Sequence, residues 1–248
     1  MIAPLLLLAL AGSAEAVPAD MKACLAMVHD DVAHGAKAAA AWRARGGGVD
    51  AARCEALALI AQEKWSEAAL AFEQAAADAE RLKDPRRADL SVQAGNAWLA
   101  AGDAAKAKAA LDAALAAEGS TPQLKGEAYL DRARAAVALG DPAAARADID
   151  RALQVVAADP FAWYLSAALA RRTRDMARAQ ADIARAVGLA PNEASILLEA
   201  GNIAGVAGDV DGARRFYERA AKAAPGSEAG RAAEQALAAN GGPVTPPR

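Results

Sequence analysis

The chain has 248 residues, a formal net charge of −3 at pH 7, and 55% hydrophobic residues of which few are aromatic. Much of the hydrophobic fraction is alanine, which favours helix but contributes little apolar area per residue. Runs of alternating apolar and polar residues are absent and no basic stripe stands out, so the sequence predicts an all-helical protein and argues against nucleic acid as its partner.

Residues 1–16 have the pattern of a signal peptide. An apolar run with four consecutive leucines is followed by an Ala-Glu-Ala sequence that ends at Ala16, and signal peptidase cleaves after such small-x-small sequences. The run is shorter than the ~20 apolar residues that span a bilayer, which argues against a stable membrane anchor. We therefore expect export and a mature chain that begins at Val17; the alternative is a buried N-terminal helix.

Residues 17–48 are predicted to form a helical hairpin that caps the first repeat. Asp20 can cap a short helix, because its carboxylate can accept hydrogen bonds from the exposed amides of the first turn. Either Asp30 or Asp31 can cap a second helix, which runs to about Arg45 and is stopped by a glycine triplet. The exposed end of a helical array needs a cover of this kind.

From Val49 onward a helix–turn–helix pattern recurs. In its last three copies the register is strict, since Asp141, Asp175 and Asp209 are 34 residues apart and each begins a second helix. Alanines at fixed places in these second helices keep the same period. The predicted repeats are 49–82, 88–121, 126–159, 160–193 and 194–227, followed by a capping helix at 228–239 and a disordered tail at 240–248.

This pattern resembles the tetratricopeptide repeat (TPR), a helix–turn–helix unit with the spacing W-x2-L-G-x2-Y, then A-x3-F, then P. The resemblance implies an all-α fold, a right-handed α-solenoid of stacked TPR units with capping helices at both ends. Alanines such as Ala179 and Ala213 would then lie where two helices cross. Arg178, beside Ala179, is expected to face solvent.

The N-terminal part also resembles exported, alanine-rich TPR proteins of the alphaproteobacterial type. In these proteins a cysteine, a tryptophan before a glycine triplet and a second cysteine recur in this order, and here they are Cys24, Trp42 and Cys54. The TPR resemblance places Cys24 and Cys54 in adjacent first helices, and an exported chain meets an oxidising compartment. We predict a disulfide between them, with two separate buried thiols as the alternative, and a location in the periplasm of a Gram-negative bacterium.

The TPR resemblance further implies a concave groove, formed mostly by the first helix of each repeat. Its side chains are apolar with a few amides and arginines, which suits a bound peptide or helix. Tyr164 is the expected anchor, while Asn96 and Asn202 can bond either the backbone of an extended ligand or groups of their own hairpins. The predicted groove residues are Leu57, Val92, Asn96, Leu99, Leu130, Arg134, Tyr164, Arg171, Leu198 and Asn202.

No catalytic motif or metal-binding motif stands out in the sequence. His29 and His34 lie close to two aspartates, but their spacing puts them on different faces of a helix. There is no H-E-x-x-H, no G-x-S-x-G and no phosphate-binding glycine loop. We therefore expect no enzyme activity, cofactor or metal, and a periplasmic scaffold that binds a protein or peptide. The alternatives are a self-associating structural module of the cell envelope and a metal-binding or enzymatic protein.

Overall fold

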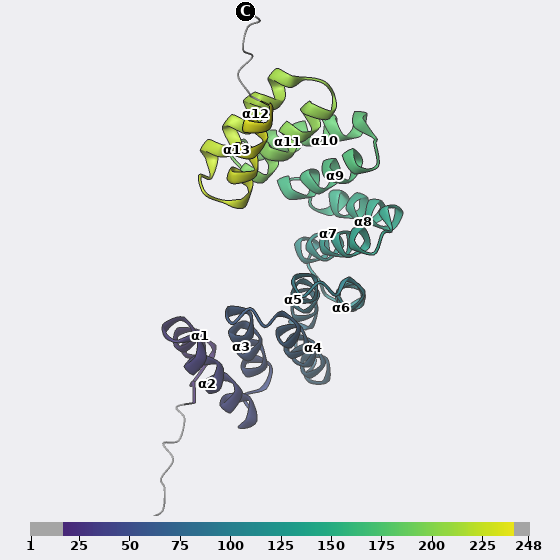
Figure 1. The fold of residues 1–248 in the computed structure, drawn as a ribbon. Helices are drawn as coiled ribbons and strands as arrows, with labels where there is room; N and C mark the ends of the chain where they lie inside the picture. Colours follow the sequence, from purple (N-terminus) through teal and green to yellow (C-terminus); the bar gives the residue numbers. More distant parts are fainter. Residues whose placement is uncertain (1–16, 241–248) are drawn as a thin grey trace, which may run out of the picture. The chain divides into compact units, whose positions relative to one another are not determined.

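The computed structural model describes residues 17–240. The predicted signal peptide with Ala16, and the tail from residue 241, lie outside the described residues. The described part contains thirteen α-helices and no strand (Figure 1). It divides into two compact units, residues 17–103 and 104–240, and each unit is described by itself. In the range 17–240, no helix is both long and apolar enough to cross a membrane.

The N-terminal unit is a row of antiparallel helices in which each helix packs on the next. The first helix also contacts the third, and this contact closes the N-terminal hairpin onto the first predicted repeat. The helices are α1 (Met21–Asp30), α2 (Val32–Ala44), α3 (Gly48–Ala61), α4 (Trp65–Leu82) and α5 (Arg87–Ala100).

The caps of the N-terminal hairpin lie where the sequence predicts them. The Asp20 carboxylate accepts from the backbone N–H of Ala23 at 2.8 Å. Of the two candidates for the second cap, Asp31 is the one used, and it accepts from the amides of residues 33 and 34 at 2.9 and 3.0 Å. The bond from the His34 amide is the main cause that lowers the pKa of Asp31. Gly46 ends α2 with φ +86°, a conformation that favours glycine.

The C-terminal unit contains the last eight helices. Three successive hairpins, α7/α8, α9/α10 and α11/α12, correspond to the last three predicted repeats, and α13 covers α11 and α12. The all-helical repeat fold is thereby confirmed. The helices are α6 (Ala104–Ala116), α7 (Pro122–Ala138), α8 (Pro142–Val155), α9 (Pro160–Arg172), α10 (Met176–Leu189), α11 (Ala194–Val206), α12 (Val210–Ala223) and α13 (Glu228–Asn240).

The 34-residue register has a visible physical basis in these hairpins. Asp141, Asp175 and Asp209 are N-caps of α8, α10 and α12, and each accepts from the amide three residues later, at 2.9, 3.2 and 2.8 Å. Ala179 is fully buried and Ala213 is 6% exposed, between the helices of their own repeats. Small side chains at these places let the helices approach closely.

Arg178 faces solvent only in part, since its side chain is 36% exposed and also forms ion pairs. Its guanidinium donates to Asp182 of the same helix at 3.3 Å and also to Asp150 of α8, in the preceding repeat. The side chain therefore links α10 to α8. The sequence did not indicate this, because Asp150 becomes a partner only when the two second helices stack.

Candidate functional site

Polar pairs inside each hairpin of the C-terminal unit hold the first helix against the second. Arg132 of α7 donates to both carboxylate oxygens of Asp148 on α8, at 2.7 and 2.8 Å. The Ser166 hydroxyl of α9 donates to Asp182 of α10 inside the core. On α11, the Asn202 side-chain oxygen accepts from the Tyr217 hydroxyl of α12 at 3.1 Å. Such satisfied, buried or part-buried pairs fix the rotation of α7, α9 and α11, and thereby the side chains that these helices present.

A cavity of about 260 Å³ opens between α7, α8 and α9, and we call it the arginine-rimmed cavity. Its floor is aliphatic, and its only charged lining residues are Arg134 and Arg172. Arg134 is half-exposed and pairs with Asp131 on its own helix at 2.9 Å. Arg172 is exposed and forms no ion pair with a described residue. The lining residues are Ala133, Arg134, Val137, Ile149, Tyr164, Leu165, Ala168, Leu169 and Arg172.

A second cavity, of about 440 Å³, lies between α9, α11 and α13, and we call it the glutamate-rimmed cavity. Its charged lining residues are three glutamates, with no lysine or arginine among the lining residues. One of them, Glu199, is paired with Arg171 through two hydrogen bonds of 2.7 and 3.1 Å. The lining residues are Tyr164, Glu193, Ala194, Ser195, Leu198, Glu199, Ala224, Ser227, Glu228, Ala229 and Ala232.

Tyr164 of α9 lines both cavities. Its ring meets the edge of Phe161 one helical turn earlier, with centroids 6.2 Å apart and an angle of 82° between the planes. Burial is the main cause that raises the pKa of the Tyr164 hydroxyl, and the charge of Glu199 adds to it, while nearby arginines oppose it. The hydroxyl is therefore neutral at pH 7 and can both donate and accept a hydrogen bond. A half-buried aromatic with a polar tip thus stands between two open cavities.

Comparison with solved structures identifies the fold. No family model matches the sequence, and no curated protein matches it. Among solved structures, PilW, described as a widely conserved type IV pilus biogenesis factor, superposes with a TM-score of 0.68 at 19% identity, covering 85% of this chain and 94% of its own. PilF of Pseudomonas aeruginosa gives a TM-score of 0.66 at 16% identity, covering 87% and 95%.

YrrB, described as a TPR protein with an unusual peptide-binding site, gives a TM-score of 0.52 at 17% identity, covering 79% of this chain and 96% of its own. The chain has the TPR fold. At these identities the likeness concerns the fold alone. TPR proteins generally mediate protein–protein interactions.

Five of the six predicted groove residues in the last three TPR repeats fall into three groups. Arg134, Tyr164 and Leu198 line the cavities. Arg171 reaches the site indirectly, because its guanidinium is held by Glu199. Asn202 has its amide engaged inside its own repeat, since it accepts from Tyr217 and donates to Glu199 at 3.2 Å. For Asn202, the structure therefore shows the hairpin bond that was the alternative to a ligand contact.

Two predicted groove residues need correction. Leu130 is 7% exposed and Val92 is 1% exposed, and both pack in the core of their units. Their register was counted from the repeat spacing alone, and a shift of one residue on a helix turns a side chain by about 100°. We therefore leave them out of the groove.

The remaining predicted groove residues, Leu57, Asn96 and Leu99, belong to the N-terminal unit. All three are half-buried, on α3 and α5. The side-chain oxygen of Asn96 is buried and has no hydrogen-bond partner among the described residues. Their part in ligand binding stays a prediction.

Three charged residues that line the cavities were missed by sequence reasoning. Arg172 lies in a run of arginines that reads as a solvated turn, and Glu193 and Glu228 lie at the N-terminal ends of α11 and α13. Charges at helix ends are common for reasons unrelated to ligands. Only the packing of α13 against α11 brings the two glutamates to one cavity.

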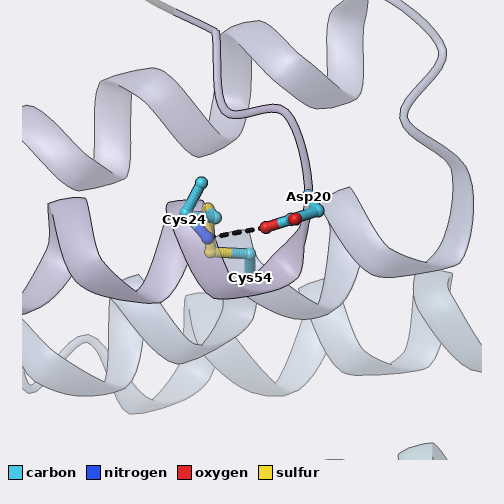
Figure 2. Close-up of a disulfide and its surroundings, with 4 residues drawn as sticks. Asp20, Cys24 and Cys54 are labelled. Atoms are coloured by element: carbon cyan, nitrogen blue, oxygen red, sulfur yellow. Dashed lines mark hydrogen bonds between the residues drawn. A yellow bond between two sulfur atoms is a disulfide. The ribbon is translucent and has the colours of Figure 1, made fainter.

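The two cysteines are joined in the N-terminal unit. The Sγ atoms of Cys24 and Cys54 lie 1.99 Å apart and their Cα atoms 6.4 Å apart, and the bond connects α1 to α3 (Figure 2). Both cysteines are fully buried, among Val28, Ala39 and Ala58. In this geometry the bond closes a loop that contains all of α2.

A third cavity, of about 370 Å³, lies between α10, α11 and α12 and contains Phe216, and we call it the Phe216 cavity. It is built largely from second helices, and Asp209 is its only charged lining residue. Within residues 17–240, no group of three or more His, Cys, Asp or Glu side chains is arranged to hold a metal ion.

Proposed function

We propose that the chain is a non-catalytic scaffold that binds an extended segment of a protein partner across α9. The binding groove consists of the arginine-rimmed and the glutamate-rimmed cavities, with Tyr164 between them. The observation that carries the proposal is that one half-buried aromatic side chain lines both cavities. A ligand that lies across Tyr164 can therefore place neighbouring side chains in both.

The chemistry of the groove supports a peptide ligand. The arginine-rimmed cavity has an aliphatic floor of residues such as Val137 and Leu165, and the glutamate-rimmed cavity adds Leu198. Apolar floors with few polar groups are typical of sites that bind side chains of a partner, and a tyrosine with a free polar tip is a frequent anchor. The likeness to YrrB, whose description names a peptide-binding site, agrees with this use of the fold.

The proposed location is the periplasm of a Gram-negative bacterium. The Cys24–Cys54 bond supports an oxidising compartment, because thiols stay reduced in the cytosol. Mass analysis of the native protein tests the location, and we expect Val17 as its first residue. An intact N-terminus in native cells would contradict export but would leave the groove untouched.

The groove is tested by capture of partners from an envelope extract. The wild-type protein and Tyr164→Ala are compared with Tyr129→Ala, a matched control on α7 that lines neither groove cavity. Thermal melts followed by circular dichroism show whether each variant stays folded. We expect Tyr164→Ala to lose at least about tenfold in captured partner and Tyr129→Ala to retain it.

Equal capture by folded Tyr164→Ala and wild type would overturn the groove. Light scattering of the captured complex identifies the case in which the partner is a second copy of the chain. A dimer that survives Tyr164→Ala would favour the self-associating module over the peptide scaffold.

A further inference from the structure

The charges along the groove are separated by sign. The arginine-rimmed cavity has two basic lining residues and no acidic one, whereas the glutamate-rimmed cavity has three acidic residues and no basic one. Tyr164 lies at the boundary between the two sets. The groove therefore has a positive and a negative side within the width of one helix.

Most of this separation survives after the internal ion pairs are counted. Arg171 and Glu199 neutralise each other through a bidentate pair. On the negative side, Glu193 and Glu228 remain, and neither forms an ion pair with a described residue. On the positive side Arg172 has no ion pair in the described range, and Arg134 shares its charge with Asp131 while staying 53% exposed.

Helix capping and helix dipoles do not fully explain why charged side chains lie at these positions. Glu193 is the N-cap residue of α11 but makes no capping hydrogen bond, and its carboxylate instead accepts from the Ser195 hydroxyl at 3.0 Å. Arg134 lies inside α7, more than a turn from its C-terminus at Ala138, where a helix dipole has little influence. Both side chains line the groove cavities on opposite sides of Tyr164.

We infer that the partner segment is bipolar: an apolar anchor against Tyr164, with an acidic side chain on the side of Arg134 and Arg172 and a basic side chain on the side of Glu193 and Glu228. This inference rests on the proposed function and adds the chemical class of the ligand. Opposite charges across an interface fix the register of a ligand and reject partners with the wrong charge pattern.

The width of the groove sets the spacing of the ligand charges. Packed helices lie ~8–10 Å apart, and the two cavities flank the single helix α9. An extended peptide rises about 3.3 Å per residue, so its acidic and basic side chains should be separated by about two or three residues. The apolar anchor lies between them.

A random dodecamer peptide library displayed on phage provides the probe. The oxidised full-length protein is used for selection, and selected peptides are remade with a fluorophore for anisotropy. We expect enriched sequences to carry an acidic residue, an apolar residue and a basic residue in the spacing above. Replacing either charged residue of a selected peptide by alanine should weaken its binding several-fold.

Charge-reversal variants make the test specific. Selection on the double variant Arg134→Glu/Arg172→Glu should enrich peptides with basic residues on both sides of the anchor. Selection on Glu193→Arg/Glu228→Arg should enrich peptides with acidic residues on both sides. Arg214→Glu is the matched control, because Arg214 is exposed on α12 and lines neither cavity, and it should give the wild-type pattern.

The possible failures separate the inference from the proposed function. If selected peptides need Tyr164 but show no charge pattern, or if the double variants keep the wild-type preference, the bipolar ligand is wrong and the groove stands. If no peptide is enriched, or if binding is the same for folded Tyr164→Ala, the groove itself is wrong and the inference falls with it.

Discussion

The two ends of the described chain are closed by different means. At the N-terminal end, α1 and α2 pack on α3 around mostly small side chains, with Cys24, Ala39, Cys54 and Ala58 fully buried and Met21 and Trp42 partly buried beside them. At the C-terminal end, α13 packs on α11 and α12 through larger ones. Leu197 and Tyr217 are buried there, and Phe216, Leu198 and Leu237 are partly buried around them.

The difference shows how an alanine-rich helical array can be ended. Burial stabilises by about 25 cal/mol per Å² of apolar surface, so contacts between alanines contribute little. The N-terminal hairpin has a disulfide in addition, which closes a separation of 30 residues. At the C-terminal end, Tyr217 of α12 fills the space beside Gly201 of α11, where a Cβ atom would lie 2.4 Å from the ring, and it also packs in one cluster with Ala233 of α13.

The largest expected effect is at the C-terminal end. Tyr217→Ala should lower the free energy of unfolding by about 3–5 kcal/mol, since it removes a buried aromatic ring and leaves a cavity in its place. Tyr217→Phe keeps the ring and removes only the bond to Asn202, so it should cost about 1 kcal/mol. Urea titrations of both variants measure the two losses. Equal losses would mean that the hydroxyl, and not ring burial, holds this end.

Removing the disulfide is the matching change at the N-terminal end. Cys24→Ala/Cys54→Ala should cost about 3–4 kcal/mol, the loop-closure value for a loop of this length. Hydrogen exchange should show the loss mainly in α1 and α2. Two titratable thiols in protein taken directly from cells, without reductant, would show that the disulfide does not form at this end.

Glycine substitutions on α11 sharpen the contrast at the C-terminal end. Gly201→Ala should destabilise by about 1–3 kcal/mol, because the new methyl group overlaps the Tyr217 ring. Gly205→Ala is the control on the same helix, since its Cβ would meet nothing closer than 3.8 Å. This change should be neutral or stabilising by up to about 1 kcal/mol. If the thermal midpoints of both variants lay below that of wild type, or both above it, the assigned packing would be contradicted.

The smallest effect concerns charge in the N-terminal unit. The Arg86 guanidinium holds the pKa of Asp84 at about 2, below its ordinary value. A carboxyl whose pKa is lower in the folded state stabilises the fold when the pH is above its unfolded pKa of about 3.9. This contribution is lost as the pH falls to about 2. The urea midpoint of Arg86→Ala should therefore approach that of wild type between pH ~4 and ~2. Arg45→Ala, an exposed control, should show no such convergence.

Sequence reasoning succeeded where the information is local or periodic. The caps Asp20, Asp141, Asp175 and Asp209 follow from residue type at a helix start, and the TPR fold follows from the repeated spacing. Tyr164 was singled out as an aromatic of a first helix with aliphatic residues beside it, and its part in ligand binding stays a prediction.

The parts that sequence reasoning missed depend on contacts between repeats. Arg178 becomes an ion-pair residue only when α10 stacks on α8, and Glu193 and Glu228 meet only when α13 docks on α11. Leu130 was placed in the groove because the repeat spacing does not resolve which neighbouring side chain turns inward. These features require coordinates, since the partners are far apart in the chain.

Photo-cross-linking tests the groove most directly. A benzophenone amino acid at Ala168, inside the arginine-rimmed cavity, is compared with the same group at Ala184, in the Phe216 cavity. With the partner recovered from envelope extract, we predict a covalent adduct from position 168 and none from position 184. An adduct from position 184 alone would place the partner on the second helices and contradict the proposed groove.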